Sequence, residues 1–150
     1  MAKSNSEKQK HTRTIGRREF VDLPLLEARH IEAKVDTGAY RTALHCLSCS
    51  VETNGASAIL VAVFDLDGLG PKTFRFSAFV QRQVRSSFGE TEMRYCIPTI
   101  VKIGRHRIKS EVSLTDRSDM RYQVLIGRRT LYKKFKVDVS KWHLLEKKQS

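Results

Sequence analysis

Short stretches of alternating apolar and polar residues recur along most of the chain. They are rich in β-branched and aromatic residues and are separated by Gly, Pro, Asn or Asp, which is typical of β-strands joined by turns. The breaks with turn composition are residues 54–55, 67–71, 88–89 and 104. The stretches that predict strands are 16–23, 30–36, 57–66, 73–82, 94–103, 107–114 and 123–126. We therefore expect a mainly β domain with antiparallel pairing.

One segment near the end has helical rather than strand spacing. After Gly127, in the run RRTLYKKFK, Leu131 and Phe135 lie four residues apart among basic side chains, as on the apolar face of a short amphipathic helix. The pattern predicts a single short helix there. A last strand is predicted from the alternation of Val137, Val139 and Trp142.

The net charge of +12 is concentrated at the two ends of the chain. Residues 1–18 hold six Lys or Arg and one acid, residues 127–150 hold eight and two, and residues 19–126 hold 14 and 13. Such ends could attract nucleic acid, an anionic surface or an acidic peptide, or could only keep the chain soluble. Aromatic residues are few and do not interleave with the basic runs, which argues against nucleic acid.

We expect one domain, residues 14–145, between a flexible basic tail at 1–13 and a flexible tail at 146–150. The opening residues lack the apolar core of a secretory signal, and the longest apolar run, 58–64, is far shorter than the ~20 residues that span a bilayer. Three cysteines are too few for a disulfide scaffold. These features predict a cytoplasmic protein without a membrane anchor, unless a natural leader has been removed.

The sharpest chemical feature is Asp36-Thr37-Gly38-Ala39, which follows the apolar alternation of residues 30–35. This order puts a carboxylate at the end of a strand. A glycine two residues on lets the backbone turn, so that amide groups can donate to the carboxylate and hold it to activate water. The triplet alone is also an ordinary turn sequence, so the motif needs support from elsewhere in the chain.

That support lies far downstream, where an apolar strand ends in Gly127-Arg128 before the predicted helix. With a glycine-bearing hairpin in mid-chain, this arrangement resembles the retroviral proteases. It resembles more closely a bacterial family of retropepsin-like aspartic peptidases long labelled ATP-dependent zinc proteases. The segments that carry the resemblance are 15–24, 34–45, 84–95, 114–122 and 124–131. Two positions depart from the family's usual pattern, since Ala43 stands in place of Ser and Cys46 in place of Ala.

The resemblance implies a single-lobed, closed β-barrel that is active as a homodimer. The catalytic loop would be formed by Asp36, Thr37 and Gly38. Because the chain holds one Asp-Thr-Gly, the second carboxylate would come from an identical chain. The residues expected in the flap or in contact with substrate are Ala39, Ser86, Ser87, Phe88 and Gly89. The strand expected beneath the loop supplies Leu125, Ile126, Gly127 and Arg128.

Two other sources of chemistry are open at this point. Asp116 or Asp119 could serve as a second carboxylate within the chain, although surface pairing with Arg117 and Arg121 is the preferred interpretation. A zinc-dependent peptidase, as the family's label suggests, would need ligands. The potential ligands His45, Cys46 and Cys49 lack the usual second pair, and neither HExxH nor a phosphate-binding GxxxxGK loop occurs. We therefore expect no metal and no cofactor.

The substrate is expected from the family resemblance. The family is often associated with an ATP-grasp ligase that adds glutamates to a ribosomal protein, which suggests an acidic, glutamate-rich peptide. The alternative is a catalytically silent β-domain that binds an acidic protein or RNA, because a fold does not by itself establish an activity.

Overall fold

The computed structural model of the chain describes residues 12–85 and 88–145. Strands dominate this part, together with one turn of 3-10 helix and one short α-helix. The elements are β1 (Arg13–Gly16), β2 (Arg18–Leu23), η1 (Pro24–Leu26), β3 (Ala28–Val35), β4 (Thr42–His45), β5 (Ser48–Asn54), β6 (Ser57–Phe64), β7 (Lys72–Phe76), β8 (Val80–Arg85), β9 (Thr91–Ile103), β10 (His106–Thr115), β11 (Val124–Ile126), α2 (Arg128–Leu131) and β12 (Phe135–Asp138).

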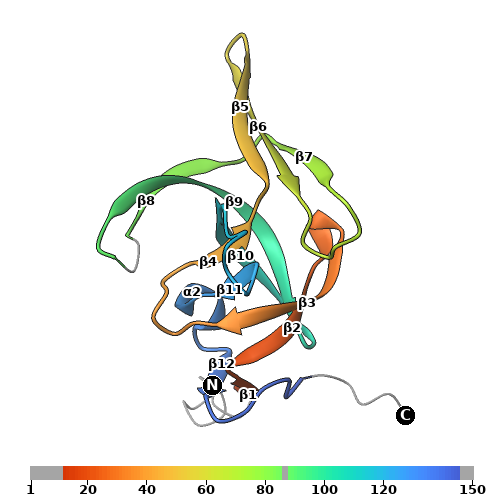
Figure 1. The fold of residues 1–150 in the computed structure, drawn as a ribbon, viewed down its shortest axis with the longest axis vertical. Coiled ribbons are helices and arrows are strands. Elements are labelled where there is room, and N and C mark those ends of the chain that lie inside the picture. The colour runs from red at the N-terminus through yellow and green to blue at the C-terminus, as the bar shows by residue number, and fades with distance from the viewer. Residues whose placement is uncertain (1–11, 86–87, 146–150) are drawn as a thin grey trace, which may run out of the picture.

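Six strands form a closed barrel (Figure 1). Their order is β10, β4, β11, β3, β2 and β9, and the ring closes because β9 also pairs with β10. The length of β9 makes this closure possible. Its last residues pair with β2, while residues 91–96 pair with β8 and extend away from the ring as a hairpin. This arrangement confirms the predicted mainly β, closed-barrel fold with a short α-helix near its C-terminal end.

The expectation of antiparallel pairing throughout is wrong. Three pairs are parallel: β1 with β12, β4 with β10, and β3 with β11. Strand β11 lies between β3 and β4, parallel to the first and antiparallel to the second. Alternation with a period of two shows which face of a strand is buried, but it carries no information on the direction of the neighbouring strand.

Several predicted strand boundaries also need correction. Residues 73–82, expected to be one strand, belong to β7 and β8, which lie in different sheets. The stretches 42–45 and 48–54, not predicted as strands, form β4 and β5. Every residue of β4 is buried, so the strand shows no alternation between polar and apolar positions. Strand β5 is mostly polar, so it also lacks the alternation of polar and apolar residues by which the other strands were predicted.

The predicted helix is shorter than expected. It ends at Leu131, because Tyr132 takes an extended conformation and Lys133 a left-handed one with φ of 61°. Phe135 then begins β12 instead of continuing the helix, and Val139 and Trp142, predicted in the last strand, lie beyond it. Within the described residues, no helix has the length and apolar composition needed to cross a bilayer.

A second sheet projects from the barrel. Strands β5, β6 and β7 form it, and the β5–β6 hairpin points away from the rest of the molecule (Figure 1). On β6, the buried residues Leu60, Ala62 and Phe64 alternate with more exposed ones and join the apolar core of the barrel. The two sheets therefore share one core at the base of the projection.

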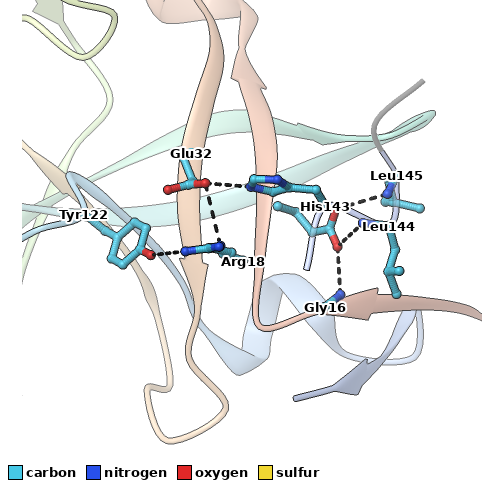
Figure 2. Close-up of polar contacts among 8 residues, drawn as sticks. Gly16, Arg18, Glu32, Tyr122, His143, Leu144 and Leu145 are labelled. Atoms are coloured by element: carbon cyan, nitrogen blue, oxygen red, sulfur yellow. Dashed lines mark hydrogen bonds and ion pairs between the residues drawn. The ribbon is translucent and has the colours of Figure 1, made fainter. Parts of the chain in front are cut away.

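Buried Glu19 holds the C-terminal segment against β2 (Figure 2). Its Oε2 atom accepts hydrogen bonds from the backbone N–H groups of Gly16 at 2.7 Å and Leu144 at 3.0 Å. Its Oε1 atom accepts a third from Leu145 at 3.1 Å. A carboxylate with three donors is well satisfied in a buried position, which explains how the core tolerates an acid here.

A second polar group, centred on Glu32, also contacts the C-terminal segment (Figure 2). His143 Nε2 lies 2.6 Å from Glu32 Oε2 on β3. Arg18 on β2 lies 3.8 Å from the same carboxylate and donates to the hydroxyl of Tyr122 at 3.4 Å. These contacts attach the C-terminal segment to β3, the strand that leads to Asp36.

Candidate active site

Asp36 follows the last residue of β3, where the chain leaves the barrel wall. Its backbone N–H donates to the carbonyl oxygen of Ile126 on β11 at 2.9 Å. The N–H of Gly38 donates to Asp36 Oδ1 at 2.9 Å, and the N–H of Ala39 donates to the Asp36 carbonyl at 3.2 Å. The turn thus orients the carboxylate. Because Asp36 is half-buried and Thr37 and Gly38 are exposed, the loop is open to water and to a peptide.

The strand beneath this loop approaches it more closely than a side chain would allow. A Cβ atom at Gly127 would lie 2.5 Å from the carbonyl oxygen of Arg41 and 2.9 Å from its Cα. Two backbone hydrogen bonds stabilise the contact. Arg128 N–H donates to the carbonyl oxygen of Ala39 at 2.8 Å, and Arg129 N–H donates to the carbonyl oxygen of Tyr40 at 3.0 Å. Residues 126–129 therefore lie directly against residues 36–41.

A buried group of hydroxyls supports the same contact and was not predicted from the sequence. Thr42 Oγ1 lies 2.6 Å from Thr130 Oγ1 and accepts a hydrogen bond from Gly127 N–H at 3.1 Å. Ser110 Oγ lies 3.0 Å from Thr130 Oγ1. These residues come from β4, β10 and α2, so no local motif signals their meeting. Together they fix the start of α2 beneath the loop.

Positive charge gathers on one side of the loop. The guanidinium groups of Arg41, Arg128 and Arg129 lie 5.1, 5.8 and 5.8 Å from the centre of the Tyr40 ring. These distances are short enough for cation–π attraction. Arg128 also donates to the carbonyl oxygen of Thr37 at 3.1 Å. Tyr40 and the two residues Arg128 and Arg129 are exposed, so this arginine cluster faces solvent beside Asp36.

The predicted flap is a long hairpin. Strands β8 and β9 pair from Val80 and Cys96 out to Arg85 and Thr91, and the hairpin lies on the same side of the molecule as the loop between β3 and β4 (Figure 1). At the tip, the Phe88 side chain is 92% exposed and Gly89 has φ of 80°, a conformation that favours glycine. The predicted flap residues Ser86 and Ser87 lie outside the described residues.

Glu111 on β10 connects this hairpin to the loop that carries Asp36. Its carboxylate accepts two hydrogen bonds from Arg82 on β8, at 2.6 and 2.9 Å, and one from Arg41 Nε at 3.0 Å. The hydrogen bonds from Arg82, and next those from Arg41, hold the pKa of Glu111 below its ordinary value, although partial burial opposes them. Arg41 is the residue whose backbone lies against Gly127, so the Glu111 side chain links the β8–β9 hairpin to the Asp36 loop.

A family model for the retropepsin-like aspartic endopeptidase RimB, described as RimB-like, matches residues 14–148. The chain belongs to the RimB-like family. This finding confirms the family expected from the sequence and agrees with the closed barrel.

Other relatives of this RimB-like chain are longer proteins. A probable alpha-L-glutamate ligase of Shewanella halifaxensis (strain HAW-EB4) is 30% identical over 129 residues, which are 84% of this chain and 28% of the relative. Another probable alpha-L-glutamate ligase, from Parasynechococcus marenigrum (strain WH8102), is 32% identical over 134 residues. These are 87% of this chain and 29% of the relative. The chain thus spans less than a third of the curated relatives that it matches.

A solved structure has the same fold as this RimB-like chain. The crystal structure of Lpg0085, a protein with unknown function from Legionella pneumophila subsp. pneumophila str. Philadelphia 1, superposes with a TM-score of 0.73 at 21% identity. The match covers 89% of this chain and 98% of that one. At this identity the likeness extends to the fold alone.

Asp116, one of the two acids proposed as a within-chain alternative, has other partners in this RimB-like structure. Asp116 Oδ1 accepts a hydrogen bond from Ser118 N–H at 2.9 Å and lies 3.7 Å from His45 Nδ1. The guanidinium of Arg117, expected to pair with Asp116, instead donates to the carbonyl of Tyr122 at 3.1 Å. Burial and the nearby charge of Arg94 lower the pKa of Arg117, and Asp36 opposes this effect, so Arg117 lies within electrostatic range of Asp36.

The potential metal ligands do not form a metal site in the described part of this RimB-like chain. No group of three or more His, Cys, Asp or Glu side chains there lies close enough to hold an ion. His45 Nδ1 accepts a hydrogen bond from Arg117 N–H at 2.8 Å, so one of its ring nitrogens already has a partner. These residues do not fit the zinc that the family's older label implies.

We expect Gly127→Ala to lower the free energy of unfolding by about 3 kcal/mol, because the new methyl group would overlap the backbone of Arg41. Gly55→Ala is the matched control, since its Cβ would meet nothing within 4 Å and only its left-handed φ of 62° would cost about 1–2 kcal/mol. Urea unfolding measures both. Hydrogen exchange at the amides of Asp36 and Arg128 should speed up only in Gly127→Ala, and unchanged exchange would contradict the close approach.

The contribution of Glu111 to stability should depend on pH. Because its pKa is depressed in the folded chain, its charge stabilises the fold above its ordinary pKa, and this effect disappears as the pH falls through the folded value. Glu111→Gln, which resembles the protonated acid, should lower the free energy of unfolding by about 1–2 kcal/mol at pH 7. The difference from wild type should shrink towards pH 3.

Glu92→Gln is the control, because Glu92 pairs with Arg94 in an exposed position. Urea unfolding at pH 7, 5 and 3 measures all three proteins. A loss in Glu111→Gln that is the same at each pH would mean that the Glu111 charge is not the stabilising group.

Proposed function

We propose that this chain is one half of an aspartic endopeptidase in which two chains each supply Asp36 to a shared site. The observation that carries the proposal is the Asp36 loop itself. Its carboxylate is half-buried, oriented by the Gly38 N–H at 2.9 Å, and held over β11 in a chain of the RimB-like family. A single chain contains one such loop, and a two-fold axis is the simplest way to bring two together.

The chemistry needs two carboxylates that share one proton. Two like charges a few ångströms apart raise one pKa, so that one group stays protonated while the other is ionised. The ionised Asp36 takes a proton from water as the water oxygen attacks the carbonyl carbon of the peptide. The protonated Asp36 of the second chain donates to the carbonyl oxygen. Proton transfer to the amide nitrogen then lets the carbon–nitrogen bond break.

The β8–β9 hairpin serves as the flap in this proposal. Closure of a flap over a bound peptide excludes water and aligns the scissile bond. Glu111 would control the base of the flap, since it joins Arg82 on β8 to Arg41 next to the catalytic loop. Ser86 and Ser87, with Phe88 and Gly89, remain the proposed contacts to substrate at the tip.

An acidic peptide is the proposed substrate. Exposed Arg128 and Arg129, which lie beside Asp36 around the Tyr40 ring, would attract carboxylates and raise the local concentration of an anionic chain. The relatives named probable alpha-L-glutamate ligase motivate a functional link to a ligase of that kind, and hence a glutamate-rich peptide. The proposal also assigns the enzyme to the cytoplasm, because three cysteines are too few for the disulfide scaffold of a small secreted domain.

Asp36→Asn should keep the fold and lower kcat/KM for peptide cleavage at least about 100-fold, because an amide cannot share the proton. The fold should persist, since the Asn oxygen can still accept the Gly38 N–H hydrogen bond. Cleavage is followed by mass spectrometry of the products, and folding by circular dichroism. Asp116→Asn and Asp119→Asn are matched controls that also test the within-chain alternative, and both should retain activity.

Mixing tests the shared site directly. Adding Asp36→Asn protein to wild type should reduce activity more than simple dilution does, because each mixed dimer lacks one carboxylate. Wild-type turnover in Asp36→Asn would end the aspartic peptidase proposal and favour a silent binding module. An additive activity in the mixtures would instead exclude the two-chain site.

A glutamate-rich peptide should be cleaved faster than a neutral one of equal length and should promote dimer formation. The preference should fall as salt rises from 50 to 500 mM, since the Debye length shortens to roughly 4 Å. Arg129→Gln should raise KM for the acidic peptide and leave the neutral one unchanged. Arg105→Gln, in the turn at the far end of β9 from the flap tip, is the control. Equal cleavage of both peptides at every salt concentration would refute the acidic substrate.

A further inference from the structure

Cys46 and Cys49 lie on either side of a bend in the chain. Cys46 follows the last residue of β4, the bend is at Leu47, and β5 begins at Ser48. Two hydrogen bonds fix the bend, since Cys46 N–H donates to the Thr115 carbonyl at 2.9 Å and Leu47 N–H donates to the Val63 carbonyl at 2.8 Å. The geometry of this segment is therefore set by neighbouring strands on both sides.

The bend turns both cysteines towards the same apolar core. Leu47, 51% exposed, and Ser48 face solvent, whereas Cys46 is buried and Cys49 is half-buried. Cys46 belongs to the core cluster, and Cys49 packs against that cluster. In a regular strand, residues three apart face opposite sides, so the bend is what lets both cysteine side chains face the same core.

The two thiols are chemically unequal. A hydrogen bond from Cys46 lowers the pKa of Cys49, whereas the same pairing and burial raise the pKa of Cys46. Cys49 is also the more exposed of the two, so a disulfide reagent can reach its sulfur, whereas Cys46 is buried behind it. This is the division of roles that a dithiol needs, with one attacking sulfur and one resolving sulfur.

Cys96 has a different position. It is fully buried on β9 but is not part of the apolar cluster that contains Cys46. Its neighbours are charged groups, among them Glu111, Arg41 and Arg82, and burial raises its pKa. Cys96 therefore provides an internal control, a third thiol of the same chain without a partner cysteine among the described residues.

We propose that Cys46 and Cys49 form a reversible dithiol–disulfide site that reacts with low-molecular-weight disulfides such as glutathione disulfide. The Cys49 thiolate attacks one sulfur of glutathione disulfide and releases one glutathione as its thiolate. The Cys46 thiol then loses its proton and attacks the Cys49 sulfur of the mixed disulfide, which releases the second glutathione. Two electrons and two protons pass from the protein to glutathione, and one intrachain disulfide forms.

The position of the site gives the disulfide a structural consequence. Strand β4 belongs to the barrel and follows the catalytic loop, whereas β5 belongs to the projecting sheet (Figure 1). A disulfide between Cys46 and Cys49 would restrict the backbone of the segment that connects these two sheets. The site needs no peptidase activity, so it stands independently of the proposed function.

The full-length protein and the variants Cys46→Ala, Cys49→Ser and Cys96→Ala are equilibrated with glutathione disulfide, quenched with acid and unfolded. Free thiols are counted with a chromogenic disulfide reagent, and intact masses are measured. Wild type should lose two of its three thiols and about two mass units without a glutathione adduct. Cys96→Ala should lose both of its thiols in the same way.

The single variants separate the roles of the two sulfurs. Cys46→Ala should accumulate one stable glutathione adduct, because no resolving thiol remains, and Cys49→Ser should react at least about tenfold more slowly, because the buried thiol is left. Circular dichroism checks that each variant is folded, and the wild-type thiol count holds even if a variant fails to fold. Retention of three thiols in wild type, a stable glutathione adduct on wild type, or a disulfide between two chains would each overturn the proposal.

Discussion

The architecture of the candidate site depends on one close approach of two backbones, that of β11 to the loop 36–41. No Cβ atom fits between Gly127 and Arg41, so the peptide groups themselves make the contact. The approach lets the Ile126 carbonyl oxygen accept a hydrogen bond from Asp36 N–H. It also lets Arg128 N–H donate to the Ala39 carbonyl oxygen, so that hydrogen bonds hold both ends of the loop. Since backbone groups in a dense contact have few alternative positions, packing fixes where Asp36 leaves the barrel wall, and the Gly38 N–H then orients its carboxylate.

Arg41 extends this constraint to the rest of the site. Its backbone lies against Gly127, while its guanidinium donates to Glu111, which also receives two hydrogen bonds from Arg82 on β8. A shift at the base of the β8–β9 hairpin would therefore act on the same residue that lies against Gly127 beneath the loop. The network is partly shielded from solvent, so its ion pairs are less screened than surface pairs. The chain thus has a direct physical path between the β8–β9 hairpin and the Asp36 loop.

The sequence predicted those features whose physical cause is local. Asp36-Thr37-Gly38 and the apolar run before Gly127 each have a short-range signal, a turn glycine or a buried strand, and the structure brings them together. It did not reveal the hydroxyl pair of Thr42 and Thr130, whose members lie 88 residues apart. The parallel pairings were also missed, since strand direction leaves no trace in alternation. Likewise, no local pattern around Glu19 predicts that three backbone N–H groups donate to its carboxylate, because two of these donors are 125 and 126 residues away in the sequence.

The charge distribution gives the proposed dimer a specific physical problem. β1 and β12 pair in parallel, with Arg13 opposite Phe135 and Thr14 opposite Lys136, so the two basic ends of the sequence meet in one small sheet. Two copies brought together near this sheet would repel, and the repulsion would reach across roughly a Debye length of 8–10 Å. A polyanionic substrate bound at the arginine cluster would offset part of that repulsion. By linkage, a substrate that favours the dimer is also bound more tightly by the dimer than by the single chain. The same electrostatic free energy would therefore strengthen both dimer assembly and substrate binding.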